Sequence, residues 1–334
     1  MKQGKQTYRM QTPVYIAHTF AIGGPYEAKG SFGQFFDYVM DDDEWGCKTH
    51  EKTEIKMQKH AINGILEKSG LKQTEIDCLM GGDLLNQIVP SSFSAREFEI
   101  PFTGMYNACA TFAESLAMGS TWLQNGMRNV ICTVSSHYAT AERQYRYPLE
   151  LGTQPTPASQ WTVTAAASAL LTTDACDAPV IESVTLGKVV DLKCTDANNM
   201  GAAMAPAACD TILTHLRDTG RVVDDYDLIV TGDLGRFGMD TLRFLAKQEG
   251  IMLEDRLNDC GAMVYKKEQK PGQGGSGAGC SASVYCAYLH RQLCDGAWKR
   301  ILFVPTGALL SKASSLQGES IPGIAHAVEI VKEN

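Results

Sequence analysis

The sequence predicts a duplicated α/β fold with five layers in the order α/β/α/β/α. Two observations lead to this prediction: a segment that repeats along the chain, and two helices without a polar face at equivalent places in the two copies. A helix that is apolar all round has to be buried between other layers. Two such helices therefore predict a central helical layer between two sheets, with further helices outside.

The repeat is clearest in a short strand that ends in a Gly-Asp turn. Residues 77–84 (DCLMGGDL) return as 227–234 (DLIVTGDL), which places Asp83 and Asp233 at an offset of 150 residues, 233 minus 83. Each copy has the continuous apolar pattern of a buried strand. The alternative is that two ordinary strand and helix units share such a turn by chance.

The elements around these strands also match. Amphipathic helices over 49–70 and 206–220 precede them, and both end at a glycine. Downstream, a small-residue apolar helix over 109–126 precedes a strand over 129–134. A similar helix over 279–296 precedes a strand over 300–304.

The remaining segments complete the two halves. We expect strands over 14–24, 162–173 and 180–191, with a Pro-containing and Gly-containing surface loop over 147–160. The predicted division lies at residue 178, giving an N-terminal half of 1–178 and a C-terminal half of 179–334. Residues 272–279 (GQGGSGAG) are typical either of a phosphate cradle or of close helix packing, and we favour packing because no Walker lysine follows.

Composition restricts the classes of function. The 334 residues are 44% hydrophobic and 20% charged, with a mean hydropathy of -0.15, as in ordinary folded proteins. The net charge of -8 gives no general attraction for nucleic acid or anionic membranes. We find no leader or spanning segment and expect a cytoplasmic protein. The eleven cysteines include no C-x-x-C pair, so we expect reduced thiols, with no metal site and no cofactor.

Polar candidates gather at predicted strand ends. Cys109 begins the first apolar helix, where backbone N–H groups and the helix dipole favour a thiolate and can hold a carboxylate. His137 ends the next strand, and Arg143 and Arg146 follow it. An arginine fork suits carboxylates, so this region is a candidate anion site. The alternatives are a buried structural cysteine and histidine with solvated arginines.

Asp83 and Asn86 follow the first repeat strand. The second copy of the repeat has no counterpart of Asn86 and Gln87, which favours a site role for the first copy alone. The alternative is that Asp83 and Asp233 only form turns or helix caps. Asp83 would repel a bare dicarboxylate, so it would either face calcium in a chelate or be held by a neighbour.

The sequence resembles the stage V sporulation protein AD family, a branch of the thiolase-like superfamily. The segments that carry the resemblance are 4–7, 83–87, 135–137, 139–148, 204–208, 225–229, 258–261, 306–311 and 319–322. It implies a thiolase-like α/β/α/β/α fold that binds dipicolinate (pyridine-2,6-dicarboxylate) or calcium dipicolinate. The resemblance assigns the ligand pocket to Asp83, Asn86, Cys109 and His137. We add Arg143 and Arg146 because their positive charge suits a carboxylate ligand.

The resemblance also implies partners and a place. These are sporulation membrane channel proteins, a peripheral position at the forespore or spore inner membrane, support of ligand uptake into the developing spore, and a homodimer through edge strands. One departure is visible, because Ala110 stands where the family pattern leads us to expect serine.

A condensing enzyme is the main alternative function. Such enzymes use a cysteine nucleophile and two donors from the second half, typically two histidines or a histidine and an asparagine. The corresponding turns here carry Asp233 and 274–277, without histidine. A carboxylate there would repel an enolate, so we expect a binder and not an enzyme. A scaffold for a membrane channel complex and a pocket role for His326 stay open.

Overall fold

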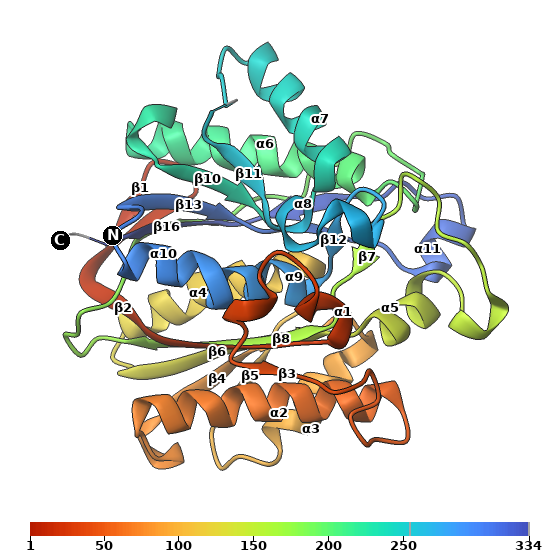
Figure 1. Ribbon diagram of the computed structural model, residues 1–334. Coiled ribbons are helices and arrows are strands. Elements are labelled where there is room, and N and C mark those ends of the chain that lie inside the picture. The colour runs from red at the N-terminus through yellow and green to blue at the C-terminus, as the bar shows by residue number, and fades with distance from the viewer. Residues whose placement is uncertain (254, 333–334) are drawn as a thin grey trace.

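The structure is a computed structural model that describes residues 1–253 and 255–332. Its main feature is one sheet of twelve strands with helices on both faces (Figure 1). The main strands of the first half are β2 (Thr7–Gly23), β4 (Cys78–Gly82), β5 (Phe102–Gly104), β6 (Asn129–Ser136) and β8 (Ala165–Thr172). Those of the second half are β9 (Val180–Thr185), β10 (Leu228–Thr231), β11 (Leu257–Asp259), β13 (Arg300–Val304) and β16 (Ala327–Val331). Shorter strands are β1 (Lys2–Gln3), β3 (Tyr38–Val39), β7 (Trp161–Thr162), β12 (Gly275–Ser276), β14 (Thr306–Ala308) and β15 (Gly323–Ala325).

The two sets of five strands have the same order and the same directions. The orders are β5-β4-β6-β8-β2 and β11-β10-β13-β16-β9. In each set the first two pairings are parallel and the last two antiparallel. β2 pairs with β9 and so joins the sets into one sheet. This symmetry confirms the duplicated fold, while the division at residue 178 stays a prediction because the sheet is continuous.

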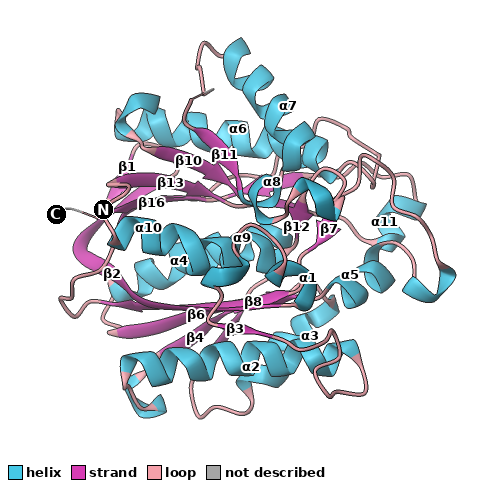
Figure 2. Ribbon diagram, in the orientation of Figure 1, coloured by secondary structure: helices cyan, strands magenta, loops and turns pink. Residues whose placement is uncertain are grey.

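Helices form three layers around the two sets of strands (Figures 1 and 2). The outer layers are α2 (His50–Ser69) with α3 (Val89–Ala95), and α6 (Met200–Thr219) with α7 (Gly235–Gln248). The central layer is α4 (Thr111–Leu123), α9 (Ala278–Val284) and α10 (His290–Cys294). Shorter helices are α1 (Pro25–Ala28), α5 (Tyr138–Tyr145), α8 (Cys260–Val264) and α11 (Lys312–Leu316). The predicted order α/β/α/β/α is therefore confirmed.

α4 and α9 are buried as their composition predicts, whereas α10 buries only His290 and Leu293. All seven residues of α9 are buried, as are nine of the thirteen in α4. The helix predicted over 279–296 is divided, because a π-helical turn over Tyr285–Leu289 separates α9 from α10.

Both outer helices end at the predicted glycines, Gly70 and Gly220, but only α2 begins where the sequence predicts. The Thr49 hydroxyl caps α2 by accepting a hydrogen bond from the backbone N–H of Lys52, and Gly70 ends it at φ 69°. α6 begins at Met200, six residues before the predicted start, with Asn199 as its cap. Pro206 thus lies inside the helix instead of opening it, at the cost of one helical hydrogen bond.

The glycine-rich segment serves close packing. A Cβ atom on Gly277 would lie 2.8 Å from Ser136 Oγ, and one on Gly279 would lie 2.6 Å from the carbonyl oxygen of Ala165. Real Cβ atoms essentially never approach that closely, so a side chain would push α9 away from β6 and β8. The packing interpretation of residues 272–279 is therefore confirmed.

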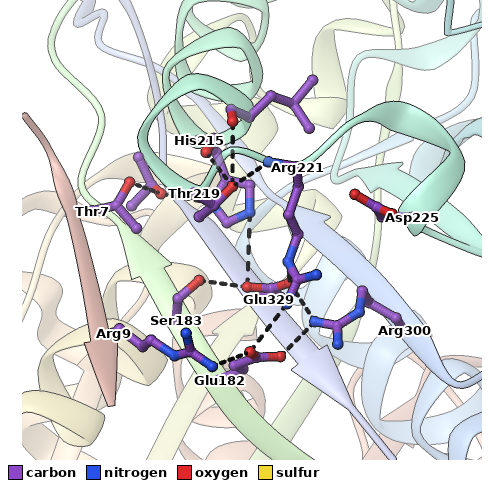
Figure 3. A network of polar contacts seen from close by, with 12 residues as sticks. Thr7, Arg9, Glu182, Ser183, His215, Thr219, Arg221, Asp225, Arg300 and Glu329 are labelled. Carbon is purple, nitrogen blue, oxygen red and sulfur yellow. Dashed lines mark hydrogen bonds and ion pairs between the residues drawn. The ribbon is translucent and has the colours of Figure 1, made fainter. Parts of the chain in front are cut away.

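A network of charged side chains ties the first half to the second (Figure 3). The Glu329 carboxylate on β16 lies 2.6 Å from Arg221 Nε and 2.5 Å from Arg300 Nη1. Both arginines also pair with Glu182 on β9, and Glu182 pairs with Arg9 on β2 at 2.9 Å. The network therefore connects strands from both halves where the two sets of strands meet.

Candidate functional site

Cys109 lies in a short 3-10 turn, Ala108–Ala110, that leads into α4. Ala108 has a positive φ of 50°, which is unusual for a residue with a side chain and marks a tightly constrained turn. The Cys109 side chain is nearly buried, at 8% exposure. The turn therefore holds the thiol in a fixed position at the start of the central helix.

Three polar side chains from the second half form a chain of contacts that begins at this thiol. Cys109 Sγ lies 3.8 Å from Ser276 Oγ, and the Ser276 hydroxyl donates to Asp233 Oδ2 at 3.0 Å. The Thr306 hydroxyl donates to Asp233 Oδ1 at 2.6 Å. We call Cys109, Ser276, Asp233 and Thr306 the cysteine cluster. Its carboxylate comes from the second Gly-Asp turn, which differs from the expectation that only the first copy contributes to the site.

The cysteine cluster disfavours a thiolate. Burial raises the pKa of Cys109 well above its ordinary value, and the negative charge of Asp233 raises it further. Burial also raises the pKa of Asp233 to about 6. The thiol is therefore protonated at neutral pH, in contrast to the thiolate that its place at a helix start suggests.

Two adjoining cavities lie beside the cluster. The inner cavity is small, about 30 Å³, and reaches Cys109. The outer groove is open and about 690 Å³ in volume. Tyr145 and Leu310 line both. The groove is lined by Leu85, Asn86, Gln87, Tyr106, Thr140, Arg143, Gln144, Tyr145, Leu310, Ser311, Lys312 and Ala313.

The charged side chains that line these cavities are all cations. Arg143 and Lys312 line the groove, and Arg146 lines the inner cavity. No aspartate or glutamate is among the described residues that line either space. Arg143 forms an ion pair with Glu51 outside the lining, and Arg146 forms one with Glu142. Nη1 of Arg146 is buried without a hydrogen-bond partner.

The groove wall includes a strained loop. Gln87 and Ile88 both have positive φ, at 57° and 46°, so two consecutive residues with side chains adopt the left-handed region. The backbone N–H of Asn86 donates to Gln144 Oε1 at 3.0 Å, which fixes the loop against α5. Such strain persists only where surrounding contacts hold it, and it is frequent at binding sites.

Asp83 is held inside the protein and lines neither cavity. It has no exposed surface. Its carboxylate accepts hydrogen bonds from the backbone N–H of Leu85 at 2.8 Å, the backbone N–H of Ser91 at 2.9 Å and the Ser91 hydroxyl at 2.6 Å. Of the two roles expected for Asp83, this geometry corresponds to a carboxylate held by its neighbours.

His137 also lies outside both cavities. Its Nδ1 accepts a hydrogen bond from the backbone N–H of Ala139 at 3.2 Å, so it caps α5. The proton is then on Nε2, which donates to the carbonyl oxygen of Asp43 at 2.9 Å. Burial lowers the pKa of His137 to about 4, so the ring is neutral at pH 7 and both nitrogens are occupied.

The structure therefore divides the six predicted residues. Cys109 and Arg146 share the inner cavity, and Asn86 and Arg143 share the groove, while Asp83 and His137 support the walls. Their ligand-binding roles stay predictions. His326 lines neither cavity. Its Nδ1 accepts from the backbone N–H of Gly187 at 3.2 Å, and its Nε2 lies 3.3 Å from Nδ2 of Asn107, two residues before Cys109.

Sequence reasoning missed Lys312, Ser276 and Tyr106 as site residues. Lys312 directly follows the family segment 306–311, which could have indicated it. Ser276 stands in the turn that lacks a catalytic donor, so its position was predicted although its contact with Cys109 was not. Tyr106 carries no signal beyond lying three residues before the cysteine.

The described residues include neither a membrane-spanning helix nor a cluster of metal-binding side chains. No helix within 1–253 or 255–332 is both long and apolar enough to cross a bilayer. Over the same residues, no three histidine, cysteine, aspartate or glutamate side chains form a group suited to a metal ion.

Sequence comparisons show the family of the chain. The family model of Stage V sporulation protein AD (SpoVAD) matches residues 4–331. The stage V sporulation protein AD of Bacillus subtilis (strain 168) is 40% identical over 326 residues, covering 97% of this chain and 96% of the relative.

Solved structures with the same fold are much more distant in sequence. The 3-oxoacyl-(acyl carrier protein) synthase III, FabH, of Xanthomonas oryzae pv. oryzae gives a TM-score of 0.64 at 14% identity, covering 97% of this chain and 100% of that one. A variant of OleA from Xanthomonas campestris gives 0.63 at 14% identity, covering 97% and 99%. These two matches show the fold alone. The chain has a thiolase-like fold and belongs to the stage V sporulation protein AD family.

Proposed function

We propose that this sporulation protein binds dipicolinate, or its calcium chelate, in the groove, and that it supports uptake of this ligand into the developing spore without catalysing a reaction. The observation that carries the proposal is the charge of the two cavities. Arg143, Lys312 and Arg146 line them and no carboxylate does, in a chain with a net charge of -8. A local cluster of cations on an acidic protein favours an anionic ligand.

The shape and chemistry of the groove suit a flat aromatic dianion. Arg143 and Lys312 supply charged donors for two carboxylates. Tyr106, Tyr145 and Leu310 supply apolar surface for a ring. Nη1 of Arg146, which has no partner, offers a further donor at the inner cavity.

The cysteine cluster supports binding over condensation. A condensing enzyme needs a reactive thiolate and donors that stabilise an enolate. Here the pKa of Cys109 is raised, and Asp233 with Ser276 occupies the positions next to the thiol. Asp233 would oppose the negative charge of an enolate.

The proposal includes partners and a place. Membership of the family supports association with sporulation membrane channel proteins at the forespore or spore inner membrane, with no nucleic acid involved. β5 is an edge strand of the large sheet, and a homodimer formed by pairing of two β5 strands is part of the proposal.

Calorimetric titration with dipicolinate, with and without calcium, tests the proposal. Arg143→Ala and Lys312→Ala should each weaken binding about tenfold, since a charge-assisted hydrogen bond is lost at a solvent-exposed site. Lys247→Ala on α7, which removes an exposed lysine outside both cavities, should leave affinity unchanged. Absence of saturable binding would contradict the proposal. Acetylation of Cys109 by acetyl-CoA, detected by mass spectrometry, would support the enzyme alternative instead.

A further inference from the structure

Two carboxyl groups lie beneath the groove without a cation. Glu54 on α2 and Asp83 after β4 both have no exposed surface. The Glu54 carboxyl accepts from the Ser135 hydroxyl at 3.1 Å and from the Thr140 hydroxyl at 2.9 Å. The donors to Asp83 are the backbone N–H groups of Leu85 and Ser91 and the Ser91 hydroxyl, all of them neutral.

Such a pair retains a proton near neutral pH. Moving a carboxylate out of water is costly, and no ion pair with a described lysine, arginine or histidine offsets the cost for either group. Burial raises the pKa of Glu54, and the nearby charge of Asp83 raises it further. Burial also raises the pKa of Asp83. The two groups therefore titrate as a pair, and Glu54 is the member that holds the proton more tightly.

The elements packed around Glu54 carry few other titratable groups. α3 and β8 carry none, β6 carries Cys132, and the part of β2 beside β8 carries Tyr15 and His18. Within four residues of Glu54, α2 itself carries the titratable side chains of His50, Glu51, Lys52 and Lys56. α5 carries Tyr138, Glu142, Arg143 and Tyr145, with His137 as its cap. Asp83 is the charge that acts on Glu54.

Direct contacts connect the pair to the groove. Thr140, the donor to Glu54, is one of the residues that line the groove. Asp83 begins the loop that carries Leu85, Asn86 and Gln87 along the groove wall. The Thr140 hydroxyl donates to Glu54, so an anion in the groove can contact only the rest of this 2% exposed side chain, and it then lies roughly 6 Å or more from the Glu54 carboxyl.

We propose that binding of a dicarboxylate in the groove is coupled to uptake of a proton by the Glu54 and Asp83 pair. This inference rests on the proposed function, because it concerns the same groove. A dianion at this distance disfavours ionised Glu54, and by reciprocity a protonated pair favours the dianion. The proton comes from solvent and stays on a carboxyl oxygen of the pair, and no bond to the ligand forms or breaks.

The coupling has a definite sign. At a pH where the free pair is already protonated, the dianion binds without proton uptake and with its highest affinity. As the pH rises, the free pair loses its proton, and binding has to recover it. Affinity for dipicolinate should therefore fall as the pH rises through the pKa of Glu54, which burial and the charge of Asp83 raise to about 8, by about tenfold for each unit by which the ligand raises the pKa of the pair.

The test is calorimetry of the full chain with dipicolinate, in two buffers with different heats of ionisation. The difference in heat gives the number of protons taken up, which we expect to be greatest where the free pair titrates. Glu54→Gln should remove both the uptake and the pH dependence of the dissociation constant. Glu67→Gln, the same change at an exposed position of α2, should leave both unchanged.

The outcomes separate this inference from the proposed function. Absence of dipicolinate binding at every pH would contradict the proposed function. Saturable binding without proton uptake, or uptake that persists in Glu54→Gln, would overturn the inference and leave the proposed function standing. If Glu54→Gln fails to fold, the two-buffer measurement on the unmodified protein still decides whether protons are taken up.

Discussion

Replacement of Glu329 by glutamine should destabilise the whole fold. The Glu329 side chain is 2% exposed, forms ion pairs with Arg221 and Arg300, and accepts a hydrogen bond from the Ser183 hydroxyl at 2.7 Å (Figure 3). Glutamine has nearly the same shape and keeps an acceptor oxygen. The substitution therefore removes the negative charge that two arginines share, with little change in packing.

The structure sets the size of the effect. Loss of one partner from a buried ion pair costs about 3–5 kcal/mol. Arg221 and Arg300 are 25% and 21% exposed and keep Glu182 as a partner, which places the cost near the lower end, about 3 kcal/mol. Unfolding entropy is about 2.1 cal/mol/K per residue, so 334 residues give about 0.7 kcal/mol/K. The expected fall in Tm is therefore about 4 °C.

Differential scanning calorimetry of Glu329→Gln measures this change. Asp174→Asn is the matched control, because it removes a carboxylate from an exposed pair with Arg128 and should leave Tm unchanged. A Tm for Glu329→Gln that equals that of the control would refute the argument that the network stabilises the junction between the two halves.

Three further predictions concern the site and its supports. His137→Ala should lower stability by about 1 kcal/mol through loss of the α5 cap, while calorimetry should show an unchanged affinity for dipicolinate. Iodoacetamide should label Cys109 far more slowly than exposed Cys176, and Asp233→Asn should speed labelling of Cys109, as peptide mass spectrometry can measure. Burial raises the pKa of Glu182, but pairing with arginines lowers it by more, so the pKa is lower in the folded protein than in the unfolded chain. The Glu182 carboxylate therefore stabilises the fold fully above the unfolded pKa, and this contribution is lost as the pH falls through the folded pKa. The Tm difference between wild type and Glu182→Gln should therefore narrow below about pH 4.5.

Each of these has an outcome that contradicts it. Loss of dipicolinate binding in a folded His137→Ala protein would place the ring in the binding site. Equal labelling of the two cysteines would show that Cys109 is accessible and reactive. A Tm difference for Glu182→Gln that stays constant down to about pH 3 would show that the charge of Glu182 does not stabilise the fold.

The fold could be predicted because its signals are local. The two Gly-Asp turns, the glycines at helix ends and the apolar central helices depend on residues close together in sequence, and the structure confirms them. The start of α6 could not be predicted from Pro206, because proline usually opens a helix and the cap at Asn199 overrides that preference.

The site could be predicted only in part. Cys109, Arg143 and Arg146 were found from their place at strand and helix ends. The pairing of Cys109 with Ser276 joins residues 167 apart in sequence, and no local pattern reports such a contact. Nor does sequence show that His137 uses both ring nitrogens in hydrogen bonds, a geometry that favours a structural histidine, while its ligand-binding role stays a prediction.

The two equivalent aspartates of the duplicated fold have different surroundings, because the turns that carry them face different elements. The turn after β4 folds back on α3, so Asp83 is held by Ser91 below the groove. The turn after β10 faces the start of α4 across the central layer, so Asp233 meets Cys109 instead. The cysteine cluster thus depends on the second half, whereas the groove wall depends mainly on the loops of the first half. Substitutions at Cys109 should therefore alter the thiol chemistry and leave the cations of the groove in place, which makes the two properties separable by mutation.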